Sequence, residues 1–417
     1  MRPIAVIVAA SMALAGCGGE GALDPSPPRG RPTTPDPLWP TPTLGETRQI
    51  APGPGMPREY VAEHGISNNN LDVVRHEGRV YLAIRNGEFH FASPDTRLFV
   101  FSSSDEVTWD FEAKVDLDRD VREPRWLSLG GRLFLYFALL GRDRFDFEPG
   151  GMRVIEREGP GRWTAPAGFY RPDQGYIPWR VRKLGARPVM LAYNHGEHEY
   201  DLSGLPIEIE LLTTDDGRAW RPLDPRVPVV SRGGGSETDA ALDDRGDLYA
   251  VIRNEAGDAT GWGSKICHAR GDRLAEWQCA HDPKKYDSPW VFARGGAVFV
   301  IGRRNVTDDG HFELSPGAPW SGAESFNNLA RYSGQPKRCA LWQLERSTLT
   351  VHHLVDLPSR GDTCFASVLD DPGSPERLIV YNYSSPIEPG LPEISWSAGQ
   401  LGPTNIYRTV VELTPPR

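Results

Sequence analysis

Residues 235–254 read GSETDAALDDRGDLYAVIRN, a stretch that combines two short strands, a tight turn and several charged side chains. The run at 240–242 predicts one strand, and the run at 248–252 predicts a second. Between them, residues 243–246 supply the Asp and Gly that tight hairpin turns require. Glu237 and Asp239 precede the first strand, and Arg253 ends the second. One hairpin therefore carries acidic and basic groups together.

The same hairpin pattern returns five more times along the chain. The further copies occupy residues 71–84, 124–137, 178–193, 289–302 and 364–383. Their starting points lie about 50 to 75 residues apart, a period typical of propeller blades and not of helical solenoids. A second marker, the series Trp109, Trp163, Trp220 and Trp277, recurs every ~55 residues in phase with the hairpins. Together the two markers predict an all-β fold, a six-bladed β-propeller of four-stranded antiparallel blades with almost no helix.

The ends of the repeat indicate how the ring closes. Three units begin at Pro124, Pro178 and Pro289. Proline lacks a ladder donor, so it suits an innermost strand with one edge facing a central channel. The last unit supplies only three strands of its own, at 365–369, 378–383 and 406–413. We expect its fourth strand to come from residues 46–51, on the N-terminal side.

The N-terminus is expected to be a targeting segment. A short basic start and a brief apolar stretch end in Leu14-Ala15-Gly16-Cys17, which resembles the lipobox of bacterial lipoproteins. Residues 1–17 are then a signal peptide, with lipidation of Cys17. The alternative is an ordinary secretory signal that contains a chance cysteine. Residues 18–55 are rich in Pro and Gly and are expected to form a tether, and residues 56–417 the propeller.

Export of the chain would determine both its location and the oxidation state of its cysteines. The expected location is the bacterial cell envelope, at the outer membrane or cell surface, with contact to the membrane only through the lipid. Four cysteines remain after Cys17, and an even number in an exported chain indicates disulfides. Cys267 and Cys279 flank a hairpin-like turn and are expected to pair, which leaves Cys339 with Cys364. A zinc site is the alternative, although the spacings match no usual finger.

Composition and charge limit the classes of partner that the protein could bind. The chain has 417 residues and a net charge of −10, and no basic block offsets the acidic excess, which disfavours a nucleic-acid partner. An anionic small ligand would need local arginines. The ten histidines show no metal-ligand spacing, and His195 and His198, three apart in an expected loop, are only a weak signal. We expect a monomer that uses no metal and no cofactor.

Polar residues at the strand ends are the candidates for a site at the mouth of the channel. Those just before the inner strands are Asp72, Arg122, Glu123, Glu237, Asp239, Asp287 and Asp362, and those ending the second strands are Arg85, Arg253, Arg303, Arg304, Tyr381 and Tyr383. A carboxyl pair could serve acid–base chemistry, and arginines could bind a carboxylate or sulfate. The structural alternative is a set of ion pairs between blades. Tyr176 and Trp179 are candidates for a sugar platform or for ordinary core packing.

Two segments resemble the Asp-box of sialidases and related propellers. Thr213-Thr214-Asp215-Asp216-Gly217-Arg218-Ala219-Trp220 is similar to the pattern Ser/Thr-x-Asp-x-Gly-x-Thr-Trp, and residues 103–109 (SSDEVTW) resemble a shorter copy without the Gly. In that family the box is a structural turn on the outer rim. The resemblance therefore implies that the Asp caps its own turn and that the Trp packs between blades.

The wider chain is similar to a bacterial group of sialidase-like propellers. The segments that carry this resemblance are 236–239 with 253–254, 302–304, 357–363, 381–385 and 404–407, and it extends over most of residues 60–413. It implies an exo-acting glycosidase that removes terminal sugars, sialic acid or another acidic sugar, from glycans. In sialidases the nucleophile is a Tyr activated by a Glu. The resemblance therefore implies Tyr383 or Tyr381 with Glu237, and Asp72 or Asp239 as the acid.

The implied substrate-binding residues are Arg122, Glu123, Arg253, Arg303, Arg304, Asp362 and Tyr381. One departure concerns the first arginine of sialidases, which stands in an Arg-Ile-Pro motif at the opening of the first blade. This chain has Ser67-Asn68-Asn69-Asn70-Leu71-Asp72 there, and the similar Arg122-Glu123-Pro124 opens the second blade. The alternative function is a non-catalytic propeller lipoprotein that binds a glycan or a protein partner.

Overall fold

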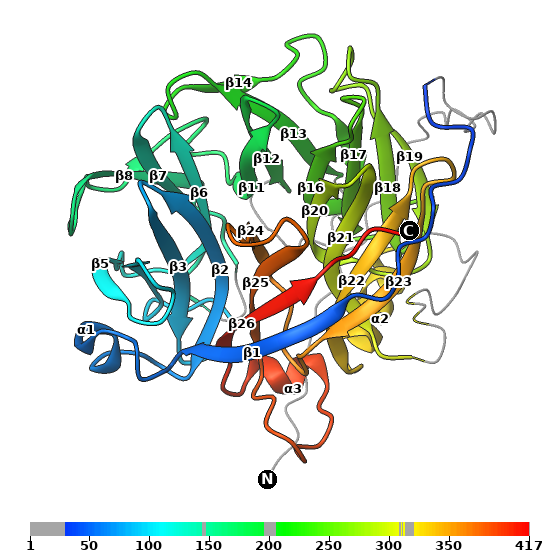
Figure 1. Cartoon of the computed structure of the whole chain (residues 1–417). Helices are drawn as coiled ribbons and strands as arrows, with labels where there is room; N and C mark the ends of the chain where they lie inside the picture. The colour runs from blue at the N-terminus through cyan, green and yellow to red at the C-terminus, as the bar shows by residue number, and fades with distance from the viewer. Residues whose placement is uncertain are drawn as a thin grey trace.

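The computed structural model describes residues 30–143, 147–195, 206–307, 310, 312 and 321–416. Within them, six antiparallel sheets stand around a common centre (Figure 1). Successive innermost strands β2, β6, β11, β16 and β20 contact one another, and β24 contacts β2. The prediction of a six-bladed β-propeller is confirmed.

The first three blades follow the chain in order. Blade one contains β2 (Ser67–His76), β3 (Arg79–Gly87), β4 (Arg97–Ser103) and β5 (Asp110–Val115). Blade two contains β6 (Val121–Leu129), β7 (Arg132–Leu139) and β8 (Met152–Gly159), with the short strands β9 (Arg162–Trp163) and β10 (Ala167–Gly168). Blade three contains β11 (Ile177–Leu184), β12 (Arg187–Asn194), β13 (Ile207–Thr214), β14 (Trp220–Pro222) and β15 (Ser231–Gly233).

The remaining blades complete the ring. Blade four contains β16 (Gly235–Leu242), β17 (Leu248–Asn254), β18 (Ser264–Ala269) and β19 (Gln278–Asp282). Blade five contains β20 (Asp287–Arg294), β21 (Ala297–Asn305), β22 (Lys337–Glu345) and β23 (Thr350–Leu357). Blade six contains β24 (Ser367–Asp370), β25 (Arg377–Ser384), β26 (Asn405–Glu412) and β1 (Thr43–Ala51). The expected closing strand is thus part of β1, which pairs antiparallel with β26 and lies beside it in Figure 1.

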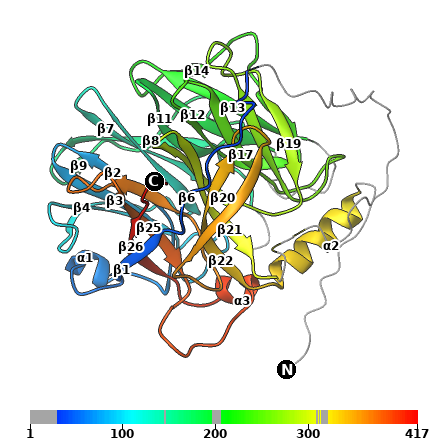
Figure 2. The same cartoon turned by 45° about the vertical axis from the view of Figure 1, so that its right-hand side comes forward.

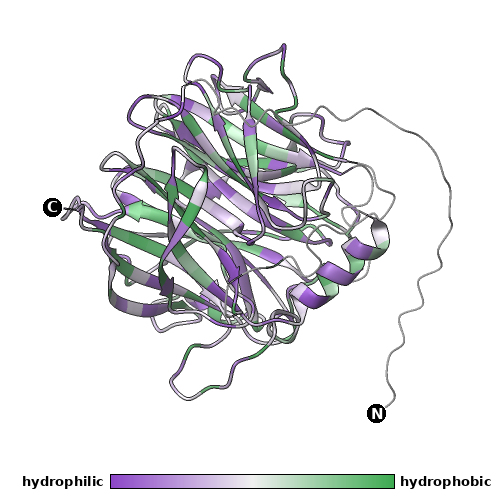
Figure 3. Cartoon of the chain, turned by 90° about the vertical axis from the view of Figure 1, so that its right-hand side faces the viewer, coloured by the Kyte–Doolittle hydropathy of each residue, from purple (hydrophilic) through white to green (hydrophobic). Residues whose placement is uncertain are grey.

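The core lies between the blades, so the middle strands are buried on both faces. In β21 the whole run Ala297-Val298-Phe299-Val300-Ile301 is buried, a near-continuous apolar segment of the kind that strands covered on both faces require. Figure 3 shows this apolar colouring along the inner parts of the sheets and polar colouring in the outer turns. Burial of this surface provides the main driving force for folding.

The two Asp-containing turns have the same construction. Asp105 accepts the backbone N–H groups of Val107 and Thr108, and Asp216 accepts those of Arg218 and Ala219. The capping carboxylate of the second turn is therefore Asp216, not Asp215 as alignment to the pattern implied. Each turn ends in a tryptophan that packs on a neighbouring blade: Trp109 on Tyr381 and Trp220 on Tyr136.

Both expected disulfides are present. Cys267 on β18 lies opposite its partner Cys279 on β19, so this bond links two strands of one blade. Cys339 on β22 is bonded to Cys364, which precedes β24. The second disulfide therefore links blade five to blade six.

The structure differs from the expected tether in the part of that segment it describes. Within residues 30–42, Asp36 and Trp39 contact blade five: the Trp39 ring meets Phe299 edge-on at 5.0 Å, and the Trp39 backbone N–H donates to Gln343 at 2.8 Å. Arg346 forms an ion pair with Asp36 at 2.7 Å. The average composition of the segment does not predict this docking, because the docking depends on single residues, here one aromatic ring and one carboxylate. Residues 1–29, with Cys17, lie outside the described residues.

The described part of the chain contains more helix than the sequence predicts. The helices are α1 (Arg58–Val61), α2 (Gly322–Ser333) and α3 (Trp396–Gln400). Ser321 caps α2 by accepting the N–H of Glu324 at 3.2 Å, and Figure 2 shows the helix at the periphery of the ring. Among these helices none has the length and apolarity needed to cross a bilayer.

Candidate functional site

An irregularity near the start of each innermost strand builds the site. The pairing register shifts there in β2, β6, β11, β16 and β20. In blade six the pairs Thr363–Ser384 and Ser367–Tyr381 are four positions apart on the first strand and three positions apart on the second. One extra residue makes a bulge and redirects a side chain. The residues of these bulges that line one shared cavity are Asn70, Glu123, Trp179, Glu237, Ser288 and Phe365.

The cavity has a volume of about 600 Å³. The ends of the second strands contribute Tyr193, Arg253, Arg303 and Tyr383, and the start of β6 contributes Arg122. The loop after β3 contributes His90 and Phe91, α2 contributes Phe326, Leu329 and Ser333, and α3 contributes Trp396 and Gln400. The strand ends therefore supply the charged residues of the lining together with Trp179 and Phe365, and α2 and α3 supply mainly apolar residues.

Glu123 is held in a conformation that costs energy. Its φ of 56° lies in the left-handed region, which is disfavoured for a non-glycine residue by about 1–2 kcal/mol. Asn70 donates to its Oε1 at 2.8 Å, and Arg125 lies 3.4 Å from its Oε2. Burial, with a smaller effect of Glu237, raises the pKa of Glu123 to about 7 against the opposing effect of the nearby arginines. A carboxyl group with this pKa is suited to general-acid chemistry near neutral pH.

Glu237 is fully engaged within blades four and five. Arg253 donates to its Oε1 at 2.6 Å, and the Ser288 N–H and hydroxyl donate to its Oε2 at 2.7 and 3.1 Å. Arg253 also pairs with Glu255 at 3.1 Å and with the buried Asp287 at 3.3 Å. No tyrosine of the described residues forms a hydrogen bond with Glu237, so the Tyr–Glu pair that the resemblance implied is not formed in this structure.

Tyr383 is instead paired with Asp362. The phenol donates to Asp362 Oδ1 at 2.9 Å, and Trp396 Nε1 donates to the same oxygen at 2.9 Å. His90 Nδ1 lies 2.7 Å from Oδ2. Asp362 is completely buried, and three side chains from three different segments converge on it. It is therefore the centre of a rigid polar cluster at the edge of the cavity.

Two other arginines complete the polar lining. Arg303 donates to the Tyr332 hydroxyl and to the Thr363 carbonyl, each at 3.2 Å, and its guanidinium stacks over Trp396 at 4.5 Å. Arg122 donates to Asp120 at 2.6 Å and to the His90 carbonyl at 3.0 Å. Together with Arg253, these residues place three guanidinium groups around one cavity, which suits an anionic or acidic ligand.

Two of the predicted catalytic residues do not line the cavity. Asp72 accepts the Trp126 N–H at 2.8 Å and the Ser367 hydroxyl at 2.6 Å. Asp239 accepts the Val291 N–H at 2.7 Å and pairs with Arg182 at 2.9 Å. Both lie beyond the bulge of their strands, where the side chains face the adjoining blades. Their observed contacts are blade-to-blade links.

Several further predicted residues are also placed away from the cavity lining. Arg304 pairs with Asp356 at 2.7 Å, and the Tyr381 hydroxyl donates to Glu106 at 2.9 Å between blades six and one. Arg85 is buried against Asp120 at 2.9 Å. Strand alternation explains the first case, because Arg304 is the direct neighbour of the cavity-facing Arg303 and points to the opposite face. Tyr381 shares a strand face with Tyr383 but lies two residues further from the end of β25. Tyr176 binds Glu210 and packs in the core, whereas Trp179 lines the cavity.

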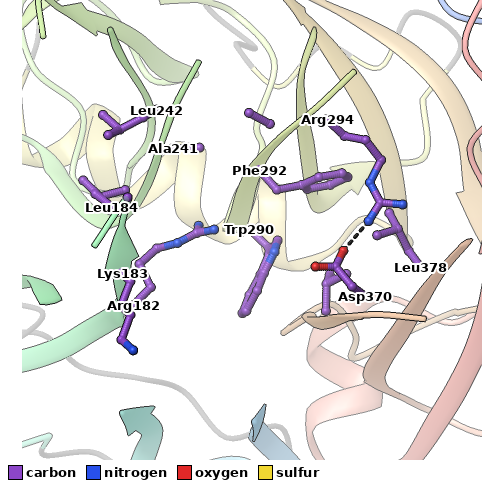
Figure 4. A pocket seen from close by; sticks show the side chains of 13 residues that line it. Arg182, Lys183, Leu184, Ala241, Leu242, Trp290, Phe292, Arg294, Asp370 and Leu378 are labelled. Atoms are coloured by element: carbon purple, nitrogen blue, oxygen red, sulfur yellow. Dashed lines mark hydrogen bonds and ion pairs between the residues drawn. The ribbon is translucent and has the colours of Figure 1, made fainter. Parts of the chain in front are cut away.

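A second hollow of about 260 Å³ lies at the opposite ends of the inner strands (Figure 4). In this view Trp290 and Phe292 lie between Leu242 and the ion pair that Arg294 forms with Asp370. The Arg182 guanidinium stacks over Trp290 at 5.3 Å and is held by Asp239. This hollow has less than half the volume of the larger cavity, about 260 against about 600 Å³, and is therefore the weaker candidate.

Sequence reasoning missed several residues of the site. His90, Asn70, Ser288, Phe365, Trp396 and the residues of α2 were not among the candidates. Aligning the six hairpins at their bulges could have identified Asn70, Ser288 and Phe365, because they occupy positions equivalent to Glu237. His90 lies in a single loop without a repeat and gives no such signal. His195 lies in the described chain and His198 outside it, and no group of three metal-ligating side chains occurs among the described residues.

Comparison with known proteins supports the fold. No family model matches the sequence, and no curated protein matches it. A solved protein of unknown function from Dyadobacter fermentans is 14% identical, with a TM-score of 0.54 over 88% of this chain and 99% of that chain. The sialidase of Trypanosoma rangeli, in complex with 2,3-difluorosialic acid, is 13% identical, with a TM-score of 0.52 over 82% of this chain and 54% of that chain.

The endosialidase of phage phi92 is 12% identical, with a TM-score of 0.52 over 89% of this chain and 70% of that chain. The chain thus spans about half the length of the trypanosomal sialidase that it matches. At these identities the likeness concerns architecture alone. The chain has a sialidase-like six-bladed β-propeller fold.

Proposed function

We propose that the protein is an exo-acting glycoside hydrolase of the sialidase-like type, which removes a terminal acidic sugar from a glycan. The observation that carries the proposal is Glu123, a carboxyl group held in a left-handed bulge, with a raised pKa, inside a cavity that also contains three arginines. A cavity of about 600 Å³ lies within the usual range for small-ligand sites, so it suits one or two sugar rings.

In this proposal Glu123 is the general acid. Its protonated carboxyl would donate a proton to the glycosidic oxygen as the bond to the anomeric carbon breaks. Arg303, Arg253 and Arg122 would orient the carboxylate of the acidic sugar. Trp179 and Phe365 would offer an apolar surface to the sugar ring. The reaction needs no cofactor.

The lipobox-like sequence before Cys17 supports a second part of the proposal, attachment to the bacterial envelope through a lipid. Because Gly18 and not Asp follows the cysteine, we propose sorting to the outer membrane. The substrate would then be a glycan encountered at the cell surface.

A binding function is the second candidate, and one observation favours it. Glu237 and Asp362 are saturated by donors of the protein itself, which leaves less freedom for proton transfer. In that case the cavity would bind a glycan and leave it intact. Retention of an acidic sugar without release of product would identify this function.

The test is a hydrolysis screen of the purified protein on aryl glycosides that include sialosides and uronides. We expect turnover of at least one acidic glycoside and a fall of kcat by about 100-fold or more in Glu123→Gln, because loss of a general acid costs this much. Glu412→Gln, which alters an exposed ion pair with Arg377, is the matched control. Binding of acidic sugars without turnover of any glycoside would contradict the proposal.

A further inference from the structure

His90 has the geometry of a histidine prepared for proton transfer. Its backbone N–H donates to the Gln400 carbonyl at 3.0 Å, which fixes the loop after β3 to α3. Its Nδ1 lies 2.7 Å from Asp362 Oδ2, which fixes the orientation of the ring. The imidazole lines the cavity and is 14% exposed, whereas the Asp362 side chain is 0% exposed.

Asp362 determines which ring nitrogen of His90 carries the proton. Although burial acts in the opposite direction, the hydrogen bond from His90, the charge of Arg303 and the hydrogen bond from Tyr383 hold the pKa of Asp362 below its ordinary value, so the carboxylate is ionised. An ionised carboxylate only accepts hydrogen bonds, and therefore Nδ1 carries the proton and Nε2 carries the lone pair. Burial lowers the pKa of His90 against the opposing effect of Asp362, so the neutral form predominates at neutral pH.

Tyr383 is poorly placed to be the attacking group. Its side chain is 1% exposed, and its proton already lies in the hydrogen bond to Asp362. Burial, together with Asp362, raises the pKa of Tyr383 well above its ordinary value. Transfer of the phenol proton to a carboxylate whose own pKa is lowered is unfavourable, so Asp362 is a weak base for this tyrosine. His90 presents a basic nitrogen on the same cluster, nearer to the solvent of the cavity.

We propose that His90 is the general base of a single-displacement reaction in which a water molecule attacks the anomeric carbon and inverts its configuration. This inference rests on the proposed glycosidase function. The water oxygen forms the new bond to the anomeric carbon, and its proton passes to His90 Nε2. The bond to the leaving oxygen breaks with its electron pair, and that oxygen takes the proton of Glu123. Asp362 remains ionised and stabilises the imidazolium. Afterwards His90 releases the proton on Nε2 to solvent, and Glu123 takes up one proton from solvent.

The decisive measurement needs no variant. Proton NMR of the wild-type reaction, recorded within the first turnovers on a hydrolysed aryl glycoside, reports the anomer released before mutarotation. We expect the inverted anomer. Release of the retained anomer would overturn the inference and leave the glycosidase proposal intact. Failure of the wild-type protein to hydrolyse any glycoside would overturn both.

Two variants and one control test whether His90 or Tyr383 performs the chemistry. His90→Asn should lower kcat by about 100-fold or more, the usual contribution of a general base, and should leave KM nearly unchanged. His353→Asn is the matched control, because His353 also pairs with an aspartate, Asp356 at 2.9 Å, but lies outside the cavity. Tyr383→Phe should retain activity within about tenfold of the wild type, since it loses only a positioning hydrogen bond. Abolished activity in Tyr383→Phe with full activity in His90→Asn would contradict the proposal.

Discussion

Replacement of Asp239 by alanine tests whether this carboxylate links blades or performs chemistry. Asp239 is completely buried, accepts the Val291 N–H and pairs with Arg182 at 2.9 Å and Arg180 at 3.5 Å. Removal of Asp239 takes an anionic partner from both Arg182 and Arg180. Arg180 is buried, and desolvation already lowers its pKa to about 9. Breaking a buried pair by removal of one partner costs about 3–5 kcal/mol.

The expected shift in melting temperature follows from this free energy. Unfolding entropy of roughly 2.1 cal/mol/K per residue gives about 0.8 kcal/mol/K for a propeller of roughly 380 residues. A loss of 3–5 kcal/mol therefore lowers Tm by about 4–6 °C. Differential scanning calorimetry of the wild type and Asp239→Ala at one pH measures the shift.

Asp215→Asn is the matched control, because Asp215 forms an ion pair with Arg221 in which both side chains are more than half exposed. Its Tm should change by less than about 1 °C. The reasoning is refuted if Asp239→Ala melts with the wild type while losing turnover of a confirmed substrate, because Asp239 would then be a site residue and not a blade link.

Three further predictions concern the pH profile, the docked segment and the lipid anchor. The profile of kcat/KM against pH should be bell-shaped. Activity should fall as the pH rises through about 7, because Glu123 then loses its proton. Activity should also fall on the acid side, because His90 is then protonated; the groups around His90 are Asp362, Tyr383, Arg122 and Arg85. A flat profile between pH 5 and 9 on a hydrolysed substrate would contradict both assignments. Trp39→Ala should lower Tm by about 4–6 °C, because loss of a buried tryptophan costs about 3–5 kcal/mol, and unchanged melting would mean that residues 30–42 are not docked in solution. Cys17→Ala should release the protein from the membrane fraction, and unchanged partitioning on ultracentrifugation would count against acylation.

The repeat made the fold predictable from sequence. Six hairpins and the tryptophan series from Trp109 to Trp277 share one period. The hairpin pattern recurs in all six blades because each blade needs the same turn and the same packing. The prolines indicated where innermost strands begin, because the bulge at that point does not need every backbone N–H. Pro124 and Pro289 lie within the bulges of β6 and β20, where a missing N–H is tolerated.

The partners within the site could not be predicted in the same way. Glu237, Asp362 and Tyr383 were all placed near the mouth of the channel, but which carboxylate receives the Tyr383 phenol depends on a few ångströms between loops. His90, Trp396 and α2 come from connections that do not repeat. The docking of Trp39 was hidden by the average composition of its segment. Sequence patterns therefore located the mouth of the propeller but did not determine its hydrogen-bond pairs.

The dependence of activity on the leaving group tests the central claim most directly. The claim is that the large cavity hydrolyses glycosides with Glu123 as the proton donor. The measurement is kcat/KM of the wild type and Glu123→Gln over aryl glycosides whose phenols differ in acidity. We predict a shallow dependence for the wild type and a steep one for Glu123→Gln, with activity largely restored for the most acidic phenol, which departs without a proton. Equal loss of activity on every leaving group would contradict the account.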